Sequence, residues 1–330
     1  MGALLRRREF ITILGGALAW PLAVQAQQPK MPVVGFLNAT SPDTYAFNAD
    51  AFRAGLGTLG FVEGKNVTIE YRWASGDYSR MPALAKELVS RNVGVIAATG
   101  DVVSAQAAQA ATATIPIVFA IGSDPVRYGL VKSLNAPGGN VTGVTLFSST
   151  LMAKRLDLLI QLVPNARVIG LLMNPDNANV EVDIRDAQKA AGDLGRQTVV
   201  VNARNEGDFN TAFAAMKEQR VDAALIASDP MLLSQRAAVA TLAARYSVPI
   251  VYWGRAFVAA GGLISYGTDI TWMYHHVGVY CGRILKGATA TELPVLQPTK
   301  FDLVINLKAA KALNLTIPPH LLSTADEVIE

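Results

Sequence analysis

Short apolar runs alternate with amphipathic segments along most of this chain. Pro32–Leu37 is an apolar run that ends in polar residues at Asn38–Asp43. The segment that follows places Phe52, Leu56 and Leu59 at i, i+4 and i+7, which is one face of a helix. A strand, a short polar joint and a helix are therefore predicted in that order, the repeating unit of a parallel α/β sheet.

The short loops that connect these predicted strands to the helices resemble one another. The apolar run Ile117–Ile121 stops at Gly122–Pro125, and Ala223–Ala227 stops at Ser228–Pro230 in the same way. Aspartate is a favoured helix N-cap, and proline is pre-set for the first helical position. The sequence thus predicts helices beginning at Pro125 and near Met231, and a third begins after Ser41. The repetition indicates two similar halves.

The alternation of predicted strands and helices forms one complete series by residue 147, and a second series then begins. Residues 32–147 supply about five strands, and a second series follows from residue 148. The last segments are too few for a third domain and are predicted to complete the two halves. The predicted fold is α/β, with two doubly wound parallel-sheet lobes and a cleft between them. The first lobe comprises residues 31–147 plus about 264–290, and the second comprises residues 148–263 plus about 295–325.

Residues 1–26 have the pattern of an export signal. Arg6–Arg8 is basic, Ile11–Val24 is apolar but too short to span a bilayer, and small residues around Ala26 suit cleavage. Arg7–Ile11 also resembles the twin-arginine pattern, with general secretory export as the alternative. After removal of this segment the chain carries 26 basic and 25 acidic residues. This balance gives no indication of nucleic-acid binding.

Long stretches of the sequence resemble one family, the substrate-binding proteins of ABC transporters of the type that includes tryptophan-binding TrpX-like proteins. The residues that carry the resemblance are 7–16, 51–74, 116–131, 134–144, 257–270, 282–295 and 301–318. The resemblance implies a type I periplasmic-binding-protein fold with three crossings between the lobes. It also implies delivery of a small solute to a membrane permease driven by a cytoplasmic ATPase.

Candidate ligand-binding residues follow from their positions at the ends of predicted strands, where ligands bind in open α/β sheets. The candidates are Asn38, Thr40, Ser41, Thr99, Gly100, Ser123, Asp124, Asn174, Asn177, Ser228, Asp229, Tyr252 and Trp253. Our hypothesis is that the helix starts at Ser41 and Ser123 hold a carboxylate, that Asp229 pairs with an ammonium group, and that Tyr252 and Trp253 stack on an apolar group. The alternatives are plain helix capping by the aspartates and strand packing by Tyr252.

No catalytic residue, metal site or cofactor site is predicted. Gly55–Gly60 matches G-x-G-x-x-G, but it lies at the end of a helix rather than between a strand and a helix, which favours close packing over a dinucleotide site. His275 and His276 are adjacent and diverge on a helix, and no Cys/His cluster accompanies them. Cys281, the only cysteine, is predicted to be inert core.

The sequence therefore favours a monomeric, non-enzymatic receptor in the periplasm, the extracytoplasmic component of an ABC importer. Its partners would be a small solute and, indirectly, a permease and its ATPase, with no membrane span in the mature form. An aromatic or branched amino acid, or a related carboxylate, is the favoured solute. Two alternatives stay open: a ligand-sensing subunit for a signalling receptor, and an exported enzyme on the same fold.

Overall fold

Parallel strands organise the chain into two sheets, as the alternation of apolar and amphipathic segments predicts. The computed structural model describes residues 31–147 and 151–330. The predicted export signal, with its cleavage near Ala26, and the helix cap predicted at Ser149 or Thr150 lie outside the described residues. Within the described part of the chain, no helix is both long and apolar enough to cross a membrane.

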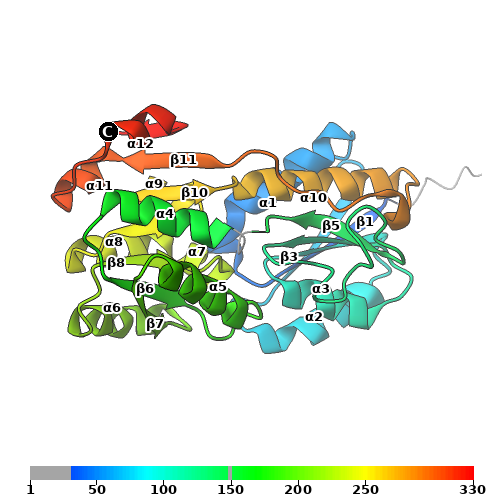
Figure 1. The fold of residues 1–330 in the computed structure, drawn as a ribbon. Coiled ribbons are helices and arrows are strands. Elements are labelled where there is room, and N and C mark those ends of the chain that lie inside the picture. Colours follow the sequence, from blue (N-terminus) through cyan, green and yellow to red (C-terminus); the bar gives the residue numbers. More distant parts are fainter. Residues whose placement is uncertain (1–30, 148–150) are drawn as a thin grey trace, which may run out of the picture. The chain divides into compact units, whose positions relative to one another are not determined.

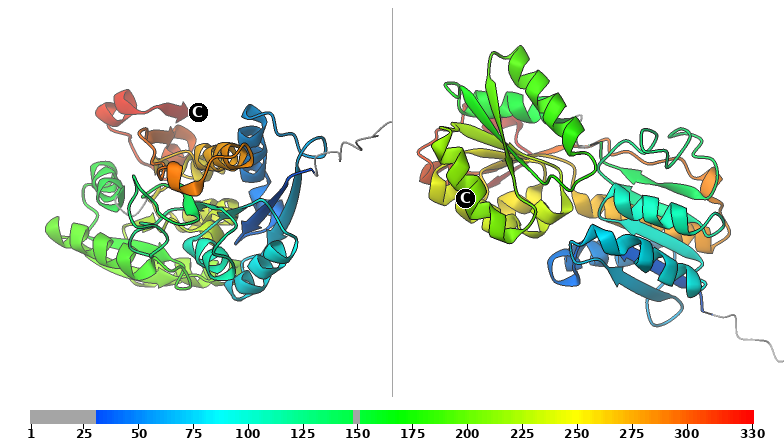
Figure 2. Two further views of the ribbon diagram at one scale, coloured as in Figure 1. Left: turned by 90° about the vertical axis from the view of Figure 1, so that its right-hand side faces the viewer. Right: turned by 90° about the horizontal axis from the view of Figure 1, so that it is seen from below.

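The first sheet has five parallel strands in the order β2-β1-β3-β4-β5. They are β1 (Val33–Asn38), β2 (Thr68–Trp73), β3 (Val95–Thr99), β4 (Ile117–Ile121) and β5 (Val141–Thr145). Helices α1 (Pro42–Thr58) and α10 (Ile270–Leu285) pack on one face, and α2 (Met81–Ser90) and α3 (Val102–Ala111) pack on the other, with the short 3-10 helix η1 (Tyr78–Arg80) before α2 (Figure 2). Because both faces are covered, alternate residues of β3 enter two different cores: Val95 and Ala97 in one, Ile96 and Ala98 in the other.

The second sheet has seven strands in the order β12-β11-β10-β9-β8-β6-β7. They are β6 (Val168–Met173), β7 (Gln197–Asn202), β8 (Ala223–Ile226), β9 (Ile250–Tyr252), β10 (Ile264–Gly267), β11 (Asp302–Asn306) and β12 (Glu327–Ile329). All pairings are parallel except the antiparallel pair of β10 and β11. The helices of this lobe are α4 (Met152–Leu162), α5 (Val180–Asp193), α6 (Phe209–Glu218), α7 (Pro230–Ser234), α8 (Arg236–Tyr246), α9 (Arg255–Ala259), α11 (Leu307–Ala312) and α12 (Pro319–Thr324), together with the 3-10 helix η3 (Glu206–Asp208) (Figure 1). The 3-10 helix η4 (Ala290–Glu292) lies beside β5 of the first sheet.

The chain passes between the two lobes three times: after β5, between β10 and α10, and before β11. The prediction that residues 264–290 return to the first lobe is wrong for Ile264–Gly267. These residues form β10, which pairs with β9 and β11 in the second sheet. The predicted return to the second lobe at residue 295 comes slightly too early in the sequence. Leu296 pairs with Val144 beside β5, so this crossing follows Leu296.

The predicted helix at Pro125 is absent, and the chain forms successive turns there. The carboxylate of Asp124 accepts a hydrogen bond from the amide of Val126, which closes a turn rather than a helix. Gly129 then adopts a positive φ of 66°, which a continuing helix does not allow. The repeat at Asp229–Pro230 does begin a helix, but it is the short α7, which is separated from α8 at Gln235.

Glycines bring α1 and α10 into backbone contact. A Cβ atom at Gly55 would lie 1.9 Å from the carbonyl oxygen of His275, and one at Gly278 would lie 2.1 Å from that of Phe52. Only glycine fits at this separation, because real Cβ contacts are longer than 3.0 Å. Of the glycines in the G-x-G-x-x-G stretch, Gly55 lies at a close helix contact, Gly57 is exposed on α1, and Gly60 follows the helix with a positive φ of 87°.

Candidate functional site

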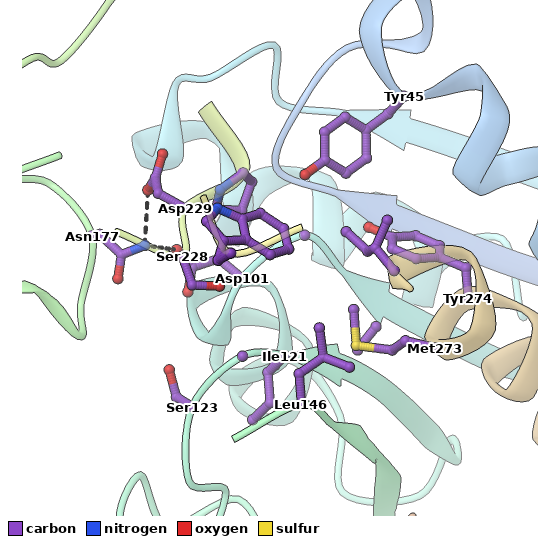
Figure 3. Close-up of a pocket in the computed structure, with 16 residues that line it drawn as sticks. Tyr45, Asp101, Ile121, Ser123, Leu146, Asn177, Ser228, Asp229, Met273 and Tyr274 are labelled. Carbon is purple, nitrogen blue, oxygen red and sulfur yellow. Dashed lines mark hydrogen bonds between the residues drawn. The ribbon is translucent and has the colours of Figure 1, made fainter. Parts of the chain in front are cut away.

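A cavity lies where the carboxyl ends of β3 and β4 in the first lobe meet those of β8 and β9 in the second (Figure 3). The volume in which the centre of a water molecule fits is only about 40 Å³, so the side chains of the two lobes nearly fill this cavity. Its lining residues come from both sheets and from α1 and α10. They are Tyr45, Gly100, Asp101, Ala120, Ile121, Gly122, Ser123, Leu146, Asn177, Ser228, Asp229, Pro230, Trp253, Ile270, Met273 and Tyr274.

Two aspartates from different lobes meet at this cavity. Asp101 caps α3 in the first lobe, and Asp229 caps α7 in the second, each through one oxygen that accepts a backbone amide hydrogen bond. The other oxygen of each accepts a hydrogen bond from Nδ2 of Asn177, at 3.2 Å for Asp101 and 2.8 Å for Asp229. Asn174 adds a second donor to Asp229, at 3.1 Å. A single amide group thus joins two buried carboxylates across the lobe boundary.

Burial makes this pair electrostatically costly. Removal from water, followed by the proximity of Asp229, raises the pKa of Asp101 to about 7. Burial also raises the pKa of Asp229, but the hydrogen bonds from Asn177, Leu232 and Asn174 oppose that rise.

The rest of the cavity is aromatic and apolar. Tyr45 from α1 and Tyr274 from α10 are fully buried and meet edge to face, with ring centroids 6.3 Å apart. Trp253 follows β9, and its buried indole nitrogen has no hydrogen-bond partner in the structure. Met273 and Ile270 complete this side. An apolar group of a ligand would find packing partners here, beside the acidic pair.

Further contacts join the lobes outside the cavity. The hydroxyl of Tyr128, from the turns after β4, donates to the carbonyl of Ala178 at 2.9 Å and lies 3.1 Å from Oδ1 of Asn179. Asn179 in turn donates to the buried carboxylate of Asp183 at 2.6 Å. On another side of the boundary, the guanidinium of Arg236 stacks 5.1 Å from the ring of Phe47.

Six of the thirteen predicted ligand residues line the cavity: Gly100, Ser123, Asn177, Ser228, Asp229 and Trp253. The remaining seven do not line the cavity: Asn38, Thr40, Ser41, Thr99, Asp124, Asn174 and Tyr252. Neither group is tested by a bound ligand, so a ligand-binding role stays a prediction for the six.

The seven others have visible structural partners. Asn38 and Thr99 hydrogen-bond to each other at 2.8 Å inside the first lobe, and Asn38 also reaches the Tyr274 hydroxyl at 3.1 Å. Asn174 supports Asp229, and Asp124 closes its turn. Tyr252 stacks on Phe257 with ring centroids 4.9 Å apart, so the packing alternative fits its environment.

The two parts of the predicted carboxylate site are separated. Thr40 and Ser41 line a different groove, together with Arg204 and Asn205 of the second lobe, whereas Ser123 lines the central cavity. The hydroxyl of Ser41 faces Thr44 at 3.1 Å and makes no capping bond to the backbone of α1. A single anionic group therefore has Ser123 beside it in the cavity, but not Ser41.

Sequence reasoning missed Asp101, Tyr45 and Tyr274. Asp101 lies directly after β3 and the predicted candidates Thr99 and Gly100, so its position carried the same signal as theirs. Tyr45 and Tyr274 lie on helices, at α1 and α10, where the rule about strand ends does not apply.

The remaining sequence candidates are accounted for by packing. Cys281 is fully buried, and burial raises the pKa of its thiol. Nδ1 of His276 contacts the carbonyl of Trp272 at 2.8 Å. Among residues 31–147 and 151–330, no group of three or more His, Cys, Asp and Glu side chains could hold a metal ion.

Comparison with known proteins gives a match over nearly the whole chain. The model of a family described as "ABC transporter substrate binding protein" matches residues 33–329. A tyrosine-binding protein from Clostridioides difficile (strain R20291) is 28% identical over 256 residues, which are 78% of this chain and 73% of that protein.

Two solved structures are also similar. An ABC domain from Streptococcus pneumonia in complex with L-Trp has a TM-score of 0.80 and 27% identity, and the match covers 90% of this chain and 99% of that one. The ligand-free, open structure of a substrate-binding protein with adhesive properties from Clostridium difficile has a TM-score of 0.64 and 26% identity, with the same coverage. The fold is thus that of type I periplasmic binding proteins, as the resemblance implies.

Proposed function

Because this chain belongs to the family of ABC transporter substrate-binding proteins, we propose that it captures an aromatic amino acid between its lobes and delivers it to a membrane permease. The family is one of binding proteins rather than of enzymes. The observation that carries the proposal is the pair of buried carboxylates, Asp101 and Asp229, beside the aromatic wall of Tyr45, Trp253 and Tyr274.

The chemistry of the cavity suits the parts of such a ligand. The ammonium group would lie against Asp101 and Asp229, where it would receive charge-assisted hydrogen bonds and offset their mutual repulsion. The side chain would pack against Tyr45 and Tyr274. The carboxylate would lie beside the hydroxyl of Ser123, which Figure 3 shows apart from the acidic pair.

Similarity to named relatives supports this choice of ligand. One relative is a tyrosine-binding protein, and one similar structure holds L-Trp. The higher TM-score to the structure with L-Trp, 0.80 against 0.64 for the ligand-free open one, supports a closed arrangement of the lobes here. Closure of this kind would let both lobes contact one ligand, which a ligand must achieve to favour the closed state.

A thermal-shift screen of the chain from Gln27 onward tests the ligand. Tryptophan, tyrosine and phenylalanine should raise the melting temperature, because a ligand at 100 times its Kd adds about 2.7 kcal/mol to the free energy of unfolding. Tryptamine and indole-3-propionate, which lack the carboxylate and the ammonium respectively, serve as matched probes. The proposal fails if no aromatic amino acid shifts the transition while leucine, a sugar or another solute does.

The extracytoplasmic location and the delivery step need their own measurements. We expect the native host to accumulate the protein outside the cytoplasm with its N-terminus near Gln27, which mass spectrometry of the purified protein would establish. Deletion of the gene should reduce uptake of the radiolabelled ligand. Normal uptake together with a lost transcriptional response to the ligand would instead identify a sensor.

A further inference from the structure

Asp101 and Asp229 belong to different lobes, so their proximity depends on how far the lobes are closed. Both carboxylates bind the same nitrogen of Asn177, at 3.2 Å and 2.8 Å, and their two oxygens therefore lie within about 6 Å of each other. Both residues are buried, at 6% and 0% exposure. The capping bonds of each stay within its own lobe, and of the hydrogen bonds that these two carboxylates accept, the one from Asn177 to Asp101 crosses the boundary.

We propose that repulsion between the Asp101 and Asp229 carboxylates keeps the ligand-free protein open, and that the ammonium group of the ligand removes this barrier to closure. The inference rests on the proposed function only for the identity of the ligand. In the open state, water screens the two carboxylates and each keeps its helix cap. Closure excludes the water and leaves one neutral amide between two negative charges, whereas a bound ammonium group supplies the missing positive charge.

The groups around Asp101 do not supply that charge. Those that interact with it electrostatically are Tyr45 from α1, Tyr78 from η1, Tyr128 from the turns after β4, Asp183 from α5 and Asp229 from α7. Burial raises the pKa of each of these three tyrosines, so they stay neutral. Asp183 adds a further acidic group, but Arg155 beside it partly compensates its charge.

A proton on Asp101 can neutralise the pair in place of the ammonium group, and the ratio of closed to open molecules therefore depends on pH. In the closed structure the pKa of Asp101 is about 7, whereas a solvated aspartate titrates near 4. The closed state therefore binds more protons than the open state between these pH values, and protons favour closure. As pH falls below 7, the ratio of closed to open ligand-free molecules should rise, by at most about tenfold per pH unit.

Fluorescence energy transfer between the lobes tests this proposal on ligand-free protein. Lys86→Cys and Lys189→Cys place labels on exposed positions of α2 and α5, and the native Cys281 is buried. At pH 8 we expect Asp101→Asn to raise the ratio of closed to open molecules by about tenfold or more and to weaken its pH dependence. Asparagine caps helices about as well as aspartate, so the fold should be retained.

Two further variants make the result decisive. Asp229→Asn should also favour closure at pH 8, because it removes the other charge. Asp124→Asn is the matched control: Asp124 caps a turn beside the cavity without lining it, and its substitution should change nothing. The proposal is overturned if folded Asp101→Asn and Asp229→Asn proteins keep the open population and pH response of the parent. Since no ligand is added, a failure of the amino-acid proposal would not produce this result.

Discussion

The side chains of Asn177 and Asp101 meet across the boundary between the lobes, with Nδ2 of Asn177 3.2 Å from a carboxylate oxygen of Asp101. The same nitrogen lies 2.8 Å from Asp229, which belongs to the lobe of Asn177 itself. Asn177 thus orients the acidic oxygen of its own lobe and contacts that of the other. It connects the chemistry of the cavity to the closure of the lobes.

Replacing Asn177 with alanine should weaken ligand binding by about tenfold to a hundredfold. The substitution removes the hydrogen bond that both carboxylates share, and bonds to charged groups contribute about 1.5–3 kcal/mol. Isothermal titration calorimetry with the best aromatic amino acid would measure the loss. Asn205→Ala, an exposed asparagine whose side chain stays within the second lobe, is the control and should bind normally. An unchanged Kd for Asn177→Ala would separate the acidic pair from ligand binding.

Tyr128→Phe should release the ligand faster while leaving the cavity intact. Its hydroxyl bonds to Ala178 and Asn179 join the lobes outside the cavity, so they exist only when the lobes are together. Loss of about 1 kcal/mol from the closed state predicts a dissociation rate roughly fivefold higher. Stopped-flow fluorescence with a competing ligand would measure that rate. Tyr246→Phe, whose ring packs on Phe213 within the second lobe, should dissociate at the parent rate. If the association rate changes instead, the contact forms before closure.

The two neighbours Tyr252 and Trp253 should differ in their effect on binding. Trp253 lines the cavity and meets Phe257 edge to face, whereas Tyr252 does not line the cavity and stacks on Phe257. We expect Trp253→Phe to weaken binding of an aromatic amino acid by about tenfold, through loss of packing area. Tyr252→Phe should leave the Kd unchanged. Calorimetry on both variants would check this, and equal losses would contradict the assignment of the cavity wall.

Much of the fold follows from the sequence because local pattern and tertiary packing agree. The buried strand Ile117–Ile121 has the predicted bounds, since apolar runs of this length between polar segments have few alternatives. The Pro125 helix failed because Asp-Pro suits a turn as well as a helix start, and Gly129 decides between them. The membership of β10 in the second sheet depends on pairing with β9 and β11, which no local pattern encodes.

The candidate site was less predictable than the fold. The rule about strand ends found Asp229, Ser123 and Trp253, because the carboxyl ends of parallel strands meet at one edge. It could not separate Trp253, which lines the cavity, from its neighbour Tyr252, which does not. Tyr45 and Tyr274 reach the cavity from helices whose packing brings them there, and the close approach of those helices depends on Gly55 and Gly278.

The contact between α1 and α10 provides the sharpest stability prediction. Gly55→Ala should lower the free energy of unfolding by about 2 kcal/mol or more, because its Cβ would meet the backbone of His275 at 1.9 Å and neither helix can move without disturbing the first lobe. Gly57→Ala is the matched control two residues away in the same helix, exposed and with nothing within 4 Å of a Cβ. It should stabilise α1 by about 0.5–1 kcal/mol, since alanine is the better helix former. Urea denaturation of the two variants would measure both free energies. Equal and small effects would mean that the helices are not in backbone contact, and with that the placement of Tyr274 in the cavity would lose its support.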